Sequence, residues 1–111
     1  MNQNLNEMIE EHRAGSPWKK GMVIFVDVDD TLIDRHDAPK DHVVRFVVEA
    51  ARKGCVLYLW SQGGADYAAE TAIRLGLANC FEGYLPKPDI AVDDLPFTTP
   101  YTKHFHPIQL I

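Results

Sequence analysis

The sequence predicts a single α/β domain with a small parallel sheet, doubly wound in three layers as in Rossmann-like folds. Apolar runs rich in β-branched residues, typical of strands buried on both faces of a parallel sheet, alternate with segments of helical periodicity. The order strand, helix, strand, helix, strand implies parallel strands joined by right-handed crossovers. A length of 111 residues leaves room for one domain around one hydrophobic core.

The first strand is expected over residues 22–28 and the first helix from Pro39 to Gly54, because proline suits a first helical turn and glycine a helix end. Apolar side chains repeat on one face of that helix. The later elements expected are strands over residues 55–60, 81–85 and 90–92, a helix from 65 to 76, and an edge strand over 108–111.

Composition and charge restrict the class of protein. The net charge of −5 argues against an electrostatic nucleic-acid binder. The sequence contains no apolar stretch of the length of a membrane span and its N-terminus lacks a signal-peptide core, so a cytoplasmic protein is expected. Cys55 and Cys80 read as reduced thiols. Residues 1–20 are expected to form an N-terminal extension and residues 21–111 the domain.

Polar side chains follow the predicted strands at their carboxyl ends. The parallel sheet would bring these ends to one edge, where open α/β sheets bind ligands. Carboxylates there suit Mg²⁺, a lysine would neutralise phosphate, and a serine with glycine amides at a helix start would donate to phosphate oxygens. The candidate site residues are Asp27, Asp29, Ser61, Lys87, Asp93 and Asp94.

In this order the residues resemble the four motifs of the haloacid dehalogenase (HAD) superfamily: DxDx[TV], a Ser or Thr after an apolar strand, a Lys, and an acidic pair after an apolar strand. The matching stretches are Asp27-Val28-Asp29-Asp30-Thr31-Leu32, Ser61 after Leu57-Tyr58-Leu59-Trp60, Lys87, and Asp93-Asp94 after Ile90-Ala91-Val92. The resemblance covers roughly residues 21 to 94 and implies a HAD-like catalytic domain.

The resemblance also implies the chemistry of a Mg²⁺-dependent phosphomonoester hydrolase. Asp27 would attack phosphorus and form an aspartyl-phosphate, while Asp29 would protonate the leaving oxygen and then activate water. Ser61 would bind a phosphoryl oxygen, and Lys87 would hold Asp27 and the phosphoryl group. The implied Mg²⁺ ligands are the Asp27 carboxylate, the Asp29 backbone carbonyl and Asp93, with Asp94 contributing directly or through water.

The sequence departs from the common HAD pattern at two places. Lys87 and Asp93 are too close in sequence for a helix between them, so Lys87 must reach the site from a short loop. No segment is long enough for a cap domain, so the site would be open and its rim would include Arg35, His36 and Tyr67. An open site suits a phosphorylated macromolecule; a nucleic acid is expected only as a phosphorylated end, and no membrane partner is expected. The alternative is that a second subunit covers the site.

Simpler interpretations remain open for each motif. The acidic pairs are also typical of polar turns, Ser61 of a helix N-cap and Lys87 of a solvated loop. A non-catalytic binding or scaffold protein on a HAD-like fold is the main alternative function. A receiver-like signalling domain shares the acidic cluster, hydroxyl and lysine, but the strand ending at Trp60 is followed by serine where a receiver has its phosphorylated aspartate.

Overall fold

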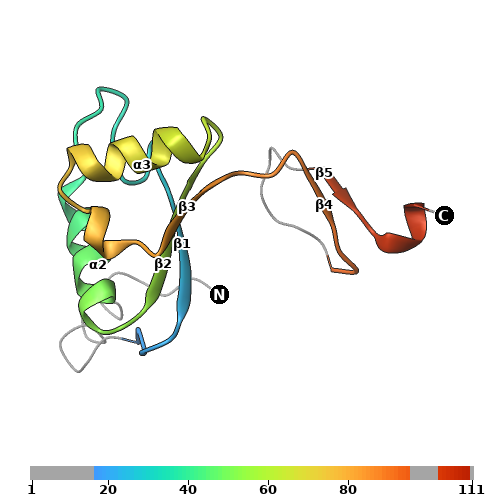
Figure 1. Cartoon of the computed structure of the whole chain (residues 1–111), viewed down its shortest axis with the longest axis horizontal. Helices are drawn as coiled ribbons and strands as arrows, with labels where there is room; N and C mark the ends of the chain where they lie inside the picture. The colour runs from blue at the N-terminus through green and yellow to red at the C-terminus, as the bar shows by residue number, and fades with distance from the viewer. Residues whose placement is uncertain (1–16, 96–102, 111) are drawn as a thin grey trace.

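The computed structural model describes residues 17–95 and 103–110 and shows a small α/β fold (Figure 1). Three parallel strands form a sheet in the order β1-β2-β3, and helices connect them. The coarse α/β prediction is therefore confirmed. The elements of this unit are β1 (Val23–Asp27), α2 (Asp41–Arg52), β2 (Val56–Ser61), α3 (Ala65–Arg74), η1 (Ala78–Cys80) and β3 (Gly83–Pro86).

Helix α2 forms where its sequence favours it. Asp41 in the first turn and Arg52 in the last turn complement the helix dipole. Val47 and Ala50 lie one turn apart on the buried face. Gly54 then adopts a φ of +88°, a left-handed conformation that costs glycine little, and the chain turns into β2.

The central strand β2 alternates strictly between a buried and a half-buried face. Leu57, Leu59 and Ser61 are fully buried, whereas Tyr58 and Trp60 are half-buried on the other face. The first set packs with the apolar faces of the helices and forms the core. Ser61 is therefore the last residue of an otherwise apolar row, directly below the edge where the strands end.

Both helices lie on the same face of the sheet (Figure 1). Two right-handed crossovers that step in the same direction place their helices on one face, and a doubly wound layout requires a reversal of strand order. Within the described residues the opposite face is open: Val23 is 61% and Phe25 47% exposed. The prediction that the first strand is buried on both faces is thus wrong, and the doubly wound, three-layer arrangement is not confirmed.

The predicted fourth strand does form, but outside this sheet. Strand β4 (Ile90–Val92) pairs in parallel with β5 (Lys103–Phe105), to one side of the main sheet beyond an extended segment (Figure 1). Only three residues separate β3 from β4. A parallel neighbour in the same sheet needs a crossover of about a dozen residues, so the prediction that β4 continues the sheet is wrong.

The chain ends differ from expectation or lie outside the description. Residues 108–110, expected in an edge strand, belong to the 3₁₀ helix η2 (Pro107–Leu110). Most of the predicted N-terminal extension, residues 1–16, falls outside the described residues. Trp18 packs edge-on against Phe46 of α2, with ring centroids 4.9 Å apart. Among the described residues, no helix has both the length and the apolar character needed to cross a membrane.

Candidate active site

A tight turn holds the aspartates that follow β1. The backbone N–H groups of Thr31, Leu32 and Ile33 all donate to the carbonyl oxygen of Val28, at 3.3, 2.9 and 3.1 Å. Asp30 has a φ of +60° within this turn. The side chains of Leu32 and Ile33 are buried, at 0% and 1% exposure, so they anchor the turn in the core. The polar side chains before them are thereby kept at the edge of the sheet.

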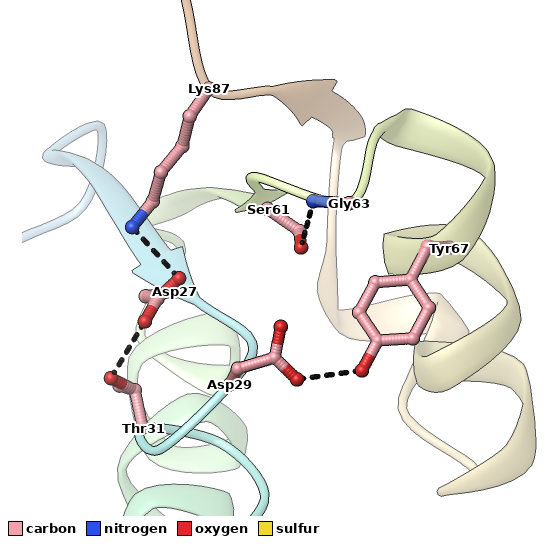
Figure 2. A network of polar contacts seen from close by, with 7 residues as sticks. All are labelled: Asp27, Asp29, Thr31, Ser61, Gly63, Tyr67 and Lys87. Carbon is pink, nitrogen blue, oxygen red and sulfur yellow. Dashed lines mark hydrogen bonds and ion pairs between the residues drawn. The ribbon is translucent and has the colours of Figure 1, made fainter. Parts of the chain in front are cut away.

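The Asp27 carboxylate has a partner at each oxygen. Lys87 Nζ lies 3.0 Å from Oδ1, and the Thr31 hydroxyl donates to Oδ2 at 3.1 Å (Figure 2). The same ammonium lies 5.6 Å from the ring centroid of Trp60. The side chains of Lys87 and Asp27 are only 14% and 30% exposed. The carboxylate is therefore fixed in orientation and faces a cation in a partly dehydrated setting.

Lys87 reaches Asp27 because it directly follows β3, which runs parallel to β2 and ends at the same edge of the sheet. Pro86 pairs with Ser61, and the Lys87 N–H then donates to the Ser61 carbonyl oxygen at 2.9 Å. Lys87 is thus held at the carboxyl edge of the sheet by the same ladder that joins β3 to β2. No crossover helix is needed for this contact, and the interpretation of Lys87 as a solvated loop lysine is wrong.

Ser61 forms the turn between β2 and α3. Its hydroxyl oxygen accepts the Gly63 N–H at 2.9 Å, and its carbonyl accepts the Gly64 N–H at 3.1 Å. Gly64, with a φ of +106°, occupies the N-cap position of α3, so the interpretation of Ser61 as that N-cap is wrong. Figure 2 shows the Ser61 hydroxyl facing the same space as the carboxylates of Asp27 and Asp29.

Asp29 has a partner that sequence reasoning placed only at the rim of the site. The Tyr67 hydroxyl, from the first turn of α3, donates to Asp29 Oδ1 at 2.7 Å. This hydrogen bond, assisted by desolvation, raises the pKa of the Tyr67 phenol to about 12. The tyrosine therefore remains a hydrogen-bond donor throughout the neutral range. The sequence feature that could have indicated this contact is Tyr67 itself, a hydroxyl-bearing aromatic residue near the start of a helix that begins at the edge of the site.

The second acidic pair does not join this group. Asp93 and Asp94 follow β4, outside the main sheet, and both are exposed. Asp93 Oδ1 accepts the Leu95 N–H at 3.0 Å. Within residues 17–95 and 103–110, no three His, Cys, Asp or Glu side chains are grouped so as to hold a metal ion. The expected convergence of Asp93 and Asp94 with Asp27 is thus not found, because β4 is not part of the sheet.

The donors left at the sheet edge still fit one kind of metal ion. Mg²⁺ keeps several waters and is commonly bound through one or two carboxylates and a substrate phosphate. The Asp27 carboxylate, with the Asp29 carbonyl as the second donor implied by the HAD resemblance, matches that requirement. No third protein carboxylate is required for this mode of binding.

The chain has no match among protein-family models, curated proteins or solved structures. The protein is a small α/β unit with two carboxylates, a hydroxyl and a lysine gathered at the carboxyl edge of its parallel sheet. The resemblance to the HAD superfamily therefore rests on the sequence motifs alone, and the last of them, Asp93-Asp94, lies outside this group.

Proposed function

We propose that this chain is a HAD-like phosphomonoester hydrolase without a cap domain, dependent on Mg²⁺ and acting through an aspartyl-phosphate. One observation carries the proposal. The Asp27 carboxylate is held between Lys87 Nζ and the Thr31 hydroxyl, and a second carboxylate, Asp29, lies on the same turn. A fixed, partly buried nucleophile beside a cation and a separate acid–base group is what phosphoryl transfer requires.

In the first half-reaction an Asp27 carboxylate oxygen attacks phosphorus and forms the new P–O bond. The bond from phosphorus to the ester oxygen breaks, and its electron pair stays on the leaving oxygen. Asp29, in its protonated form, gives its proton to that oxygen, so the product leaves as a neutral alcohol. The enzyme is left as an aspartyl-phosphate with Asp29 as a carboxylate.

In the second half-reaction a water oxygen attacks the phosphorus of the aspartyl-phosphate while Asp29 takes the water proton. The bond from phosphorus to Asp27 breaks, its electrons return to the carboxylate, and inorganic phosphate leaves. Ester and water are thereby converted to alcohol and phosphate, and both aspartates regain their starting states. A Mg²⁺ held by Asp27 and the Asp29 carbonyl would supply neutralisation of the phosphate charge.

Lys87 and Ser61 stabilise the charge that moves during these steps. The Lys87 ammonium faces the Asp27 carboxylate and would face the phosphoryl oxygens transferred to it. The Ser61 hydroxyl accepts one N–H, from Gly63, and its own proton stays available for a phosphoryl oxygen. Both groups come from the ends of β2 and β3, so the sheet fixes their distance from Asp27.

The rim of the site favours a phosphate on a large molecule. The loop after the first motif is closed by the Asp34 N–H donating to the Ala38 carbonyl at 2.8 Å, which leaves no room there for a cap. Asp29 is exposed. A phosphorylated protein, glycan or nucleic-acid end would reach such a site directly.

Cys55 and Cys80 are both free thiols, and we place the activity in the cytoplasm on that basis.

Phosphate binding without turnover is the second candidate, favoured by one observation. The acidic pair Asp93 and Asp94, which the HAD resemblance assigns to the metal, follows a strand outside the sheet. A chain that lacked this metal support would still present Lys87 and the Ser61 turn to a phosphate group. It would then act as a binding or scaffold protein.

Hydrolysis of an aryl phosphate, with Mg²⁺ and with a chelator, separates the two functions. Wild type and Asp27→Asn are compared, because asparagine keeps the size of the side chain and removes the nucleophile. We expect Mg²⁺-dependent release of phosphate by wild type only. Binding of a phosphorylated peptide by both proteins, with turnover by neither, would favour the scaffold function.

A further inference from the structure

The hydroxyl of Tyr67 makes the shortest hydrogen bond drawn at the site, to a residue with two successive proton-transfer roles in the proposed reaction (Figure 2). We propose that Tyr67 is a positioning residue that holds the Asp29 carboxyl group for proton transfer to the leaving group. This inference rests on the proposed function. The link joins α3 to the turn after β1, across 38 positions in sequence.

Asp29 needs such a partner because nothing else restrains it comparably in the described structure. Its side chain is exposed, whereas Asp27 is held at both oxygens by Lys87 and Thr31. An exposed carboxyl group on a turn samples several rotamers, and each misplacement of a proton donor lowers the rate. A hydrogen bond of 2.7 Å is short enough to select one rotamer.

The tyrosine ring is itself fixed, by Gly63. A Cβ placed on Gly63 would lie 3.0 Å from Tyr67 Cδ2 and 3.4 Å from the Ser61 hydroxyl oxygen. The ring therefore packs directly on the backbone of the turn that carries Ser61. Because Gly63 has no side chain, the Tyr67 ring can pack against the turn that carries Ser61. The same turn therefore holds Ser61 directly and Asp29 through its hydrogen bond to Tyr67.

The bond also selects which Asp29 oxygen carries the proton. Oδ1 accepts the Tyr67 hydrogen, so the proton of the acid form is directed to Oδ2. Figure 2 shows that second oxygen turned toward the space faced by Asp27 and Ser61.

Leaving-group dependence tests the inference, because only a poor leaving group needs the proton. The esters are 4-nitrophenyl phosphate, which leaves as a stable anion, and glycerol phosphate, which does not. For Tyr67→Phe we expect kcat/KM to fall by about tenfold or more on glycerol phosphate and by less than about threefold on the nitrophenyl ester.

Tyr84→Phe is the matched control. Its hydroxyl donates to the Ala78 carbonyl at 3.3 Å, away from the site, so its removal should leave both rates unchanged. Thermal unfolding of each variant establishes that it is folded. Equal losses on both esters in Tyr67→Phe, or no loss on either, overturn this inference alone. Failure of wild type to hydrolyse either ester overturns the proposed function and this inference with it.

Discussion

Replacing Lys87 by methionine removes the ammonium beside Asp27 and keeps most of the apolar stem. In the structure this ammonium lies 3.0 Å from Asp27 Oδ1, and the two side chains are 14% and 30% exposed. The substitution leaves a partly buried carboxylate with the Thr31 hydroxyl as its remaining side-chain partner in Figure 2. Both the stability of the free protein and the proposed hydrolysis should therefore decline.

The structure sets the size of each effect. Two unit charges at 3.0 Å attract by about 5 kcal/mol at an effective dielectric constant of about 20. Solvent at the 30% exposed carboxylate and the ordering of the lysine reduce this, so we expect a loss of about 1–3 kcal/mol in unfolding free energy. The loss of a preorganised charge at the reacting phosphate should lower kcat by about 100- to 1,000-fold.

Urea unfolding and steady-state hydrolysis of an aryl phosphate measure the two effects. Lys40→Met is the matched control, because the Lys40 ammonium donates to the exposed Asp30 carbonyl at 3.0 Å rather than to the Asp27 carboxylate. We expect this control to retain activity within about threefold of wild type. Equal activity of Lys87→Met and Lys40→Met would refute the electrostatic role given to Lys87.

Three further predictions concern the stability of the fold. Leu57→Ala, at a fully buried position of the central strand, should lower the unfolding free energy measured in urea by about 2–5 kcal/mol. Leu95, whose side chain is 68% exposed, is the control, and Leu95→Ala should lower it by less than about 0.5 kcal/mol. Equal losses in the two variants would contradict the assigned core. Gly64→Ala should cost about 1–3 kcal/mol in the same assay through backbone strain alone, since φ is +106° and no atom lies within 4 Å of a new Cβ; an unchanged midpoint would contradict this conformation. The Ala38 and His36 N–H groups lower the pKa of Asp34, so its ionised form stabilises the fold above its unfolded pKa and this contribution disappears as pH falls. Asp34→Ala should therefore lower the thermal midpoint at pH 7 and have a smaller effect at about pH 3, and a pH-independent difference would contradict the assignment.

Much of the fold was predictable over residues 22–76, because the residue patterns that favour each strand and helix there match the elements that the fold contains. The apolar runs became β1 and β2, and the helix expected between Pro39 and Gly54 became α2. Parallel strands end at one edge, so Asp27 and Ser61 were predictable neighbours without knowledge of any side-chain contact. The contact of Lys87 with Asp27 follows the same rule, because β3 runs parallel to β2.

The remaining features depend on properties that residue patterns do not contain. The strand at Ile90–Val92 is recognisable in the sequence, but the three residues between β3 and β4 are too few for a crossover back to the same edge. This spacing separates Asp93 and Asp94 from the site. The bond from Tyr67 to Asp29 depends on one rotamer and on the empty space above Gly63. The open face of β1 follows from strand order, which no single strand reveals.

Trapping of a covalent phosphoenzyme tests the central claim most directly. The protein is mixed with a phosphomonoester and Mg²⁺ and quenched in acid within one turnover, and its peptides are then analysed by mass spectrometry. The account predicts a phosphoryl group on the peptide that carries Asp27, labile to hydroxylamine and absent from Asp27→Asn. Phosphate release by wild type with no such adduct, or with an adduct on another residue, would contradict it.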